Sequence, residues 1–172
     1  MNMKLDIAQQ LAKSVLYLHT TGLCTRTFAQ KQFLSLIRGE AKSLFLVGFE
    51  DFREAKDDTF YTGDSLPERE MYRHPSRQGN NPERKYVMQH DIYSLGVRLL
   101  EIGMCKSFVK LEKNRLVIES DLDISERDGR KKAFATKNQL LFIAHERLSQ
   151  HIGKRFKDTV EKCLTCLDED TT

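Results

Sequence analysis

The segment QHDIYSLGVRLLEIGM, residues 89–104, sets the strongest limit on the possible folds of this chain. Its apolar residues recur at helical spacing, and they occupy more than one side of the helix. One stripe consists of Ile92, Leu95, Leu99 and Ile102, while Tyr93, Val97 and Leu100 lie on other sides. A helix that is apolar nearly all round belongs in the centre of a domain. The rest of the chain must therefore supply elements that surround it.

Three other segments show the same helical spacing. In residues 3–19 the apolar positions are Ala8, Leu11, Ala12, Val15, Leu16 and Leu18, which predict one buried stripe. Gly22 is expected to end that helix. Two more helices are expected in TKNQLLFIAHERLSQHIG and KRFKDTVEKCL, with Gly153 between them. Together with the central helix, these segments predict a mainly α protein.

The remaining segments predict a small β-structure and loops. Two short apolar runs, residues 33–37 and 44–49, flank the polar segment RGEAKS and indicate a β-ribbon. Residues 50–84 are polar, contain glycines and prolines and lack periodicity, so we expect a long loop there. Residues 105–137 are rich in charge and predict a second loop, exposed to solvent.

The composition narrows the class of protein. The chain has 172 residues, enough for one domain, and its 40% hydrophobic and 31% charged content is typical of a globular protein. A formal net charge of +3 argues against a nucleic-acid binder, which usually has a strong basic surplus. No apolar run approaches the ~20 residues of a membrane span, and the N-terminus is too polar for a signal peptide. We therefore expect a cytoplasmic protein that binds neither nucleic acid nor membrane.

Two patterns that would indicate a metal site are weak. Cys163 and Cys166 form a single C-x-x-C, whereas a zinc site needs further ligands. In HERLSQH the two histidines are six residues apart, and Ser149 stands where H-E-x-x-H requires the second histidine. No metal is expected, and reduced thiols are the preferred interpretation of the cysteines.

The order of the elements and three motifs resemble the C-terminal lobe of a protein kinase. HDIYSLGVRLLEIG is similar to the central helix of that lobe, S-D-I-Y-S-x-G-x-x-L-x-E. LHTTGLCTRTFAQKQFLSL resembles the catalytic-loop pattern L-H-x-x-G-x-x-H-R-D-x-x-x-x-N-x-L, and MYRHPSRQG resembles the segment that carries A-P-E. YRHPSRQG and the central helix look most like divergent fungal kinase-like domains. The resemblance covers about residues 5–168 and implies a mainly α, kinase-like C-lobe with a small β-ribbon.

The resemblance implies a role for each position of the catalytic loop. The H-R-D triplet falls on Thr25, Arg26 and Thr27. A kinase uses the aspartate of that triplet to accept the proton of the substrate hydroxyl, and threonine has no basic group near neutral pH. Ala29 replaces the loop lysine, and Gln32 replaces the asparagine that holds a metal ion. Arg26 matches an arginine that pairs with a phosphate in many kinases, and a surface arginine is an equal alternative.

The metal-binding D-F-G motif has its best match at Gly48, Phe49 and Glu50, with glycine in place of the aspartate. Positioning and electrostatics are nearly the whole of phosphoryl-transfer catalysis, so these substitutions predict an inactive lobe. The sequence also lacks the phosphate-binding G-x-G-x-x-G and a V-A-I-K-like lysine. Met1 already aligns with the start of the C-lobe. The resemblance therefore implies one partial domain over residues 1–172, truncated at both ends relative to a full kinase and without an N-lobe.

Two further positions concern structure rather than catalysis. Asp91 matches the aspartate that accepts hydrogen bonds from the catalytic-loop backbone in this family. The alternative is an aspartate favoured by the dipole at a helix N-terminus. Ser76 stands where kinases carry the glutamate of A-P-E, and the segment with its arginine partner is absent. The loss of both partners avoids an unpaired buried charge.

We therefore expect a catalytically inactive kinase-like C-lobe that acts as an interaction or regulatory module, or is a remnant of one. No cofactor is expected, the partner is another protein or an N-lobe outside this chain, and the oligomeric state is not predicted. One alternative is a divergent ATP-dependent protein Ser/Thr kinase, completed by such an N-lobe, in which Glu50 or Asp51 holds Mg²⁺. The other alternative is a structural fragment with no ligand.

Overall fold

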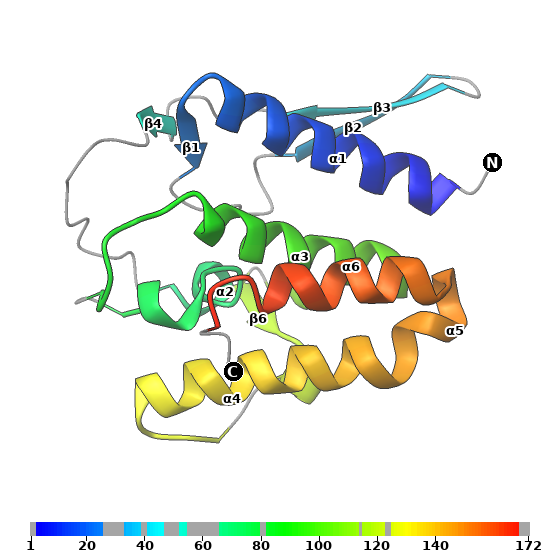
Figure 1. Ribbon diagram of the computed structural model, residues 1–172. Helices are drawn as coiled ribbons and strands as arrows, with labels where there is room; N and C mark the ends of the chain where they lie inside the picture. Colours follow the sequence, from blue (N-terminus) through cyan, green and yellow to red (C-terminus); the bar gives the residue numbers. More distant parts are fainter. Residues whose placement is uncertain are drawn as a thin grey trace.

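The computed structural model describes residues 3–25, 33–38, 41–46, 52–54, 66–79, 82–113, 115–122 and 125–168. Over these residues the chain is mainly α-helical, as the sequence predicts, and its strands form three two-stranded antiparallel sheets. The longest helices are α1 (Met3–Thr20), α3 (Gln89–Met104), α4 (Gly129–Ile143) and α6 (Lys154–Leu164). Figure 1 shows α1 uppermost, α3 and α6 side by side in the middle, and α4 below them.

The first helix, α1, forms where its apolar spacing predicts it. Ala8, Leu11, Val15 and Leu18 form one buried stripe, and α1 packs against α3. Leu16 was expected in that stripe, but it is 64% exposed because it lies on a different side of the helix. After α1 the chain turns at Gly22, whose φ of +75° is left-handed and favours glycine.

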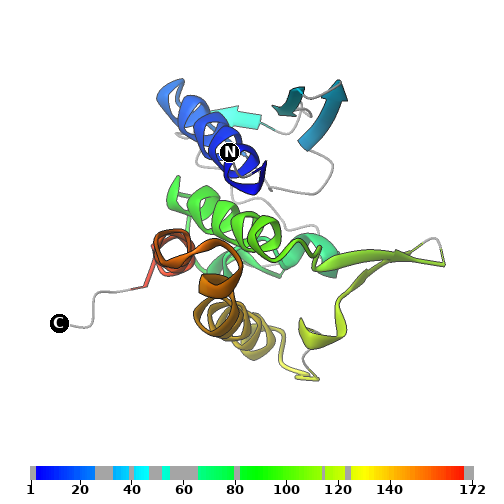
Figure 2. The same cartoon turned by 90° about the vertical axis from the view of Figure 1, so that its right-hand side faces the viewer.

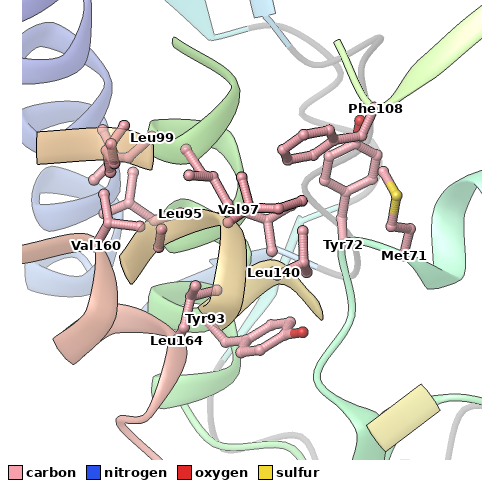
Figure 3. Packing of buried hydrophobic residues seen from close by; sticks show 14 of the residues in the cluster. Met71, Tyr72, Tyr93, Leu95, Val97, Leu99, Phe108, Leu140, Val160 and Leu164 are labelled. Carbon is pink, nitrogen blue, oxygen red and sulfur yellow. The ribbon is translucent and has the colours of Figure 1, made fainter. Parts of the chain in front are cut away.

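The predicted central helix is α3. Twelve of its 16 residues are buried, and it has α1 on one side and α6 on another (Figures 1 and 2). In Figure 3, Leu95 and Leu99 of α3 lie in the same apolar cluster as Val160 and Leu164 of α6. Full burial of one such side chain contributes roughly 1.5–3 kcal/mol, so this cluster is a main source of stability.

The predicted β-ribbon is confirmed as a hairpin of β2 (Phe33–Arg38) and β3 (Ala41–Leu46). The strands are antiparallel, with Phe33 opposite Leu46 and Arg38 opposite Ala41. β3 begins within the polar segment RGEAKS rather than after it. Strand pairing uses main-chain groups, which polar residues supply as well as apolar ones, so hydropathy does not mark this boundary.

The expectation of one long loop over residues 50–84 is wrong in part. This range contains β4 (Phe52–Glu54), α2 (Pro67–Glu70) and the 3₁₀ helix η3 (Pro75–Arg77). Each element is three or four residues long. Elements this short contain too few repeats to produce a periodic pattern.

The expectation of a solvated loop over residues 105–137 is also wrong in part: residues 110–113, 115–117 and 125–131 are exposed, but the range contains secondary structure. β5 (Val109–Glu112) pairs with β6 (Arg115–Ile118), the 3₁₀ helix η4 (Ser120–Leu122) follows, and α4 begins at Gly129. The side chain of Asp128 caps α4 by accepting hydrogen bonds from the main-chain N–H groups of Arg130 and Lys131. The charged first turn, GRKK, conceals the start of the helix from a search for apolar spacing.

The C-terminal helices agree with the sequence. α4 continues through the π-helical segment η5 (Ala144–Leu148) into α5 (Ser149–Ile152). Gly153, with a φ of +100°, separates this run from α6, as predicted. Among the helices of the described segments, none combines the length and the apolar character needed to cross a bilayer.

Candidate functional site

Most positions that resemble a degenerate kinase site lie outside the described residues. These are Arg26, Thr27, Ala29 and Gln32 of the catalytic-loop segment, and Gly48, Phe49 and Glu50 of the metal-motif segment. The main chain of Thr25 is described, as the last residue of β1 (Leu23–Thr25). The structure therefore describes the strands that border both segments, and the roles assigned to the seven positions remain predictions.

Strands β1 and β4 bring the borders of the two segments together. They pair antiparallel, with Thr25 opposite Phe52 and Leu23 opposite Glu54. The catalytic-loop segment continues from Thr25 into Arg26, and Glu50 precedes the first residue of β4 by two positions. Residues directly opposite in such a pair have Cα atoms about 4.5–5.5 Å apart. The catalytic-loop segment thus begins at this strand pair, and the metal-motif segment ends next to it. The sequence alone does not show that these two borders lie side by side.

Asp91 is buried at the junction of α1 and α3. Its Oδ2 atom is 3.2 Å from Nε2 of His19, near the end of α1. Its Oδ1 atom accepts a hydrogen bond from the hydroxyl group of Tyr86, which lies between η3 and α3. The expected contact with the catalytic-loop backbone concerns residues outside the described ranges and stays a prediction. Asp91 thus connects two helices and the segment that leads into the second.

The sequence alone did not identify His19 and Tyr86 as partners of Asp91. His19 is 72 residues away in the chain, and its only signal was its place in the L-H-x-x-G part of the resemblance. Hydrogen bonds to a carboxylate are among the stronger ones in proteins. Because Asp91 is only 2% exposed and both of its oxygens are engaged, it is suited to hold the helices together rather than to exchange protons with a substrate.

A second polar cluster lies at the turn that resembles A-P-E. Ser76 Oγ is 2.8 Å from Nδ1 of His74 and 3.4 Å from Nε2 of His90, and all three residues are buried. Burial lowers the pKa of His74 to about 4, assisted by the positive charge of Lys137. Burial likewise lowers the pKa of His90 to about 4, assisted by the neighbouring His74. Both imidazoles are therefore neutral near pH 7.

In such an arrangement a serine hydroxyl could act as a nucleophile, and a neighbouring imidazole could act as its general base. Here a substrate has no route to the hydroxyl, because Ser76 is 4% exposed. Nδ1 of His74 also accepts a hydrogen bond from the main-chain N–H of Ser76 at 3.2 Å, which caps η3. The cluster is therefore structural. Ser76, in the segment that resembles A-P-E, is thus hydrogen-bonded to two buried histidines.

Glu101, in the last turns of α3, accepts hydrogen bonds from four groups. Its Oε1 is 2.7 Å from the main-chain nitrogen of Phe108, 2.8 Å from the Tyr72 hydroxyl and 3.2 Å from the Ser107 hydroxyl. Its Oε2 is 2.7 Å from the guanidinium of Arg98, which lies 3.7 Å from the centroid of the Tyr72 ring. Burial raises the pKa of Tyr72, so its hydroxyl remains a donor. No sequence pattern indicated this cluster, and the only signal at Glu101 is its place in the L-x-E part of the resemblance.

A further cluster holds the C-terminal segment. The ammonium group of Lys137, a buried residue of α4, pairs with the carboxylate of Asp168. The thiol of Cys166 donates to the main-chain carbonyl of Gln89 at 3.3 Å. Burial, together with the neighbouring Cys163, raises the pKa of Cys166 to about 11, and burial also raises the pKa of Cys163. Both thiols of the C-x-x-C pattern are therefore protonated near neutral pH.

Neither of the two metal-like sequence patterns forms a metal site in the part of the chain that the structure describes. Histidine, cysteine, aspartate and glutamate side chains of these residues form no group of three or more suited to a metal ion. In HERLSQH, Nδ1 of His145 is 3.0 Å from Oε1 of Glu161 on α6. That contact joins two helices.

A scan against models of protein families finds no match for this chain, and a search of curated proteins finds no similar sequence. Function is therefore inferred from the residues and their geometry.

Proposed function

We propose that this chain is a kinase-like helical lobe without catalytic activity, and that its function is to bind another protein. The observation that carries the proposal is the contrast between Asp91 and Thr27. Asp91, which the resemblance assigns to structure, is present, buried and bound by His19 and Tyr86. Thr27, which the resemblance assigns to proton transfer, has no basic group.

The order of the elements supports the proposal. Helix α1 is followed by β1, the β2–β3 hairpin, β4 paired with β1, and the buried helix α3. The resemblance to a kinase C-lobe implies the order of helix, β-ribbon and buried central helix, and the β1–β4 pair is an addition to it. Because the loop and the metal motif border the same strand pair, the two acidic groups of an active kinase would belong near that pair. This chain carries Thr27 and Gly48 at those positions.

Loss of activity follows from the chemistry of the substituted positions. Phosphoryl transfer depends on a positioned base and on metal ions that neutralise the phosphates. Loss of the base alone lowers the rate by about 10²–10⁴-fold. Gln32 is one methylene longer than the asparagine it replaces, and tight octahedral Mg²⁺ coordination tolerates little displacement of a ligand. A lobe that keeps its structural residues but lacks these groups is suited to binding rather than to catalysis.

The alternative of a divergent kinase has one observation in its favour. Asp51 and Glu50 immediately precede β4, whose first residue, Phe52, lies opposite Thr25 at the end of β1. A carboxylate at either position would thus be close in the chain to the strand pair that borders the catalytic-loop segment. In this alternative, Glu50 or Asp51 replaces the missing metal ligand.

Thermal unfolding in the presence of ATP with Mg²⁺ or Mn²⁺ separates these functions. The inactive lobe should show the same Tm with and without nucleotide, and no transfer of labelled phosphate to a protein substrate. A nucleotide-dependent rise in Tm, together with phosphoryl transfer that Glu50→Ala abolishes, would overturn the proposal. Glu146→Ala removes a carboxylate from the exposed face of η5 and serves as the matched control.

Protein binding is tested separately from catalysis. A photo-crosslinking residue at Tyr17, which is 70% exposed on α1, would mark proteins that contact this helix in cell extract. Any marked protein would then be purified and titrated against the wild-type chain. Saturable binding by calorimetry supports the interaction module, and the absence of a saturable partner favours the structural fragment instead.

A further inference from the structure

The hairpin of β5 and β6 extends away from the helices, as Figure 2 shows in yellow-green. Its register places Val109 opposite Ile118, Lys110 opposite Val117, Leu111 opposite Leu116 and Glu112 opposite Arg115. Side chains alternate between the two faces of a strand. One face therefore carries Val109, Leu111, Leu116 and Ile118, and the other carries Lys110, Glu112, Arg115 and Val117.

The apolar face continues from the core into solvent. Val109, at the base of the hairpin, is 3% exposed and belongs to the core cluster. Leu111, two residues further along the strand, is 68% exposed, and Leu116 opposite it is 39% exposed. An isolated two-stranded hairpin is marginally stable, and an added strand would place further side chains beside Leu111 on the same face.

The two edges of the hairpin differ. β6 lies against α2, whereas β6 is the only strand that pairs with β5 among the described residues. An edge strand presents main-chain N–H and C=O groups in the geometry that another strand requires. The register turns the main-chain groups of Val109 and Leu111 toward this edge. The Ser107 hydroxyl donates to the Val109 carbonyl at 2.9 Å and accepts from the Val109 N–H at 3.3 Å, so Leu111 is the position at which a further strand can pair with β5.

The charges of β5 are complementary to a second copy of β5. An antiparallel pair of two β5 strands centred on Leu111 places each Lys110 directly opposite the Glu112 of the other copy. It also places the two Leu111 side chains next to each other. Directly opposed residues in antiparallel strands share a face, so this register satisfies both the charge pattern and the apolar face. The side chain of Lys110 is half exposed and also pairs with Glu119 at 2.5 Å, and an ammonium group has three donors, enough for both carboxylates.

We propose that this chain forms a two-fold symmetric dimer by antiparallel pairing of β5 with β5 of a second copy. The result is a four-stranded sheet in the order β6–β5–β5–β6, with a row of four leucines on one face. The two chains contribute the same patch, as a closed two-fold interface requires. The interface is small, because main-chain pairing is centred on Leu111 and the flanking contacts are the two Lys110–Glu112 side-chain pairs. The dimer is therefore reversible, and its fraction rises with protein concentration. This proposal is independent of the one on catalysis, and nucleotide binding does not bear on it.

Sedimentation equilibrium of the full chain from micromolar to millimolar concentration tests the dimer. The wild-type chain should associate, whereas Lys110→Glu and Glu112→Lys each place two like-charged pairs at the interface. Each variant alone should dissociate with a constant raised about tenfold. An equimolar mixture of the two variants restores both opposite-charge pairs, so the mixture should associate like the wild type.

The mixture is the decisive sample. The mixture contains the same two variant chains that are measured separately. A hairpin damaged by its own substitution would stay damaged in the mixture, so recovered association must come from the restored charge pairs. Glu146→Lys adds the same charge as Glu112→Lys on a different element and should leave the dissociation constant unchanged. A wild-type chain that stays monomeric at every concentration overturns the proposal. The proposal is also overturned if the mixture has the same dissociation constant as each variant alone. That result is expected if β5 pairs with a strand of a different protein instead of with a second copy.

Discussion

His74 and His90 are both built into the structure as neutral rings. The ring of His74 lies edge-on to Tyr93, with 5.1 Å between the centroids, and the ring of His90 lies 5.3 Å from that of Tyr86. Nδ1 of His74 accepts the main-chain N–H of Ser76, which requires this nitrogen to be unprotonated. At the scale of single residues, burial thus converts two side chains that titrate near neutral pH into neutral structural groups.

We predict that the free energy of unfolding decreases as the pH falls from about 6.5 to 4. The pKa of an unfolded histidine is 6.5, and those of His74 and His90 in the folded chain are about 4. Between these values the unfolded chain binds protons that the folded chain excludes, so protonation favours unfolding. Each histidine should remove about 2–3 kcal/mol over this interval, and neither should contribute appreciably well above pH 6.5. Urea unfolding monitored by circular dichroism at a series of pH values measures the slope.

The variant His74→Asn provides the control for this prediction. An asparagine amide oxygen can still accept the hydrogen bond from Ser76, but the side chain does not titrate. Its unfolding free energy should vary less with pH over the same interval than that of the wild type. An unchanged slope would show that His74 does not contribute to the acid sensitivity.

Helix α3 packs closely against its neighbours at two glycines. A Cβ atom at Gly96 would lie 2.8 Å from Cβ of Cys163 on α6, and one at Gly103 would lie 2.4 Å from Cδ1 of Leu148. Glycine in a helix interior is less favourable than alanine by about 1 kcal/mol. At the scale of elements, the small size of glycine lets α6 and η5 pack closely against α3, and the apolar surface buried by this packing offsets that cost.

We predict that Gly96→Ala lowers the free energy of unfolding by about 1–3 kcal/mol despite the better helix propensity of alanine. The contact joins two Cβ atoms, so no rotamer change can relieve it, and α6 has to shift. Gly129→Ala, in the first turn of α4, is the matched control because a Cβ there meets nothing within 4 Å. Chemical denaturation measures both variants. If Gly96→Ala is as stable as Gly129→Ala, then α3 and α6 are not in the close contact described above.

At the scale of the whole molecule, contacts between distant parts of the chain join its helices. Lys4 in α1 donates to the main-chain oxygen of Gly103 at the far end of α3, with 3.0 Å between the atoms. Lys137 of α4 pairs with Asp168, and Cys166 binds the main chain at the start of α3. The first helix and the last described residues are therefore both attached to the central helix or its neighbours.

We predict that Asp168→Ala destabilises the fold by about 1–3 kcal/mol, because it leaves the buried ammonium group of Lys137 without its carboxylate. Lys137→Met in the same chain removes the stranded charge and should recover most of the loss. Unfolding free energies of the wild type, both single variants and the double variant form a cycle that isolates the pair. Strictly additive effects would contradict a direct interaction between the two side chains.

The sequence by itself determined the long elements of this protein. Apolar spacing located α1, α3 and the two C-terminal helices, and the paired apolar runs located the β2–β3 hairpin, because a pattern repeated over several turns or along two strands is detectable locally. The short strands β1 and β4 and the hairpin β5–β6 escaped detection, because each offers few repeats or many charges. The assignment of substituted kinase positions from Thr25 to Gln32 and from Gly48 to Glu50 rests on motif spacing and stays a prediction, because the structure describes only the strands at their borders.

Only the tertiary structure decided which polar residues are buried and what they contact. The resemblance marked Asp91 as a structural residue, but the fold supplied His19 and Tyr86 as its partners. The fold alone revealed the carboxylate of Glu101 among its donors and the pairing of Lys137 with Asp168. The physical reason is that a buried polar group requires a partner, and the partner comes from wherever in the chain the packing of helices places it.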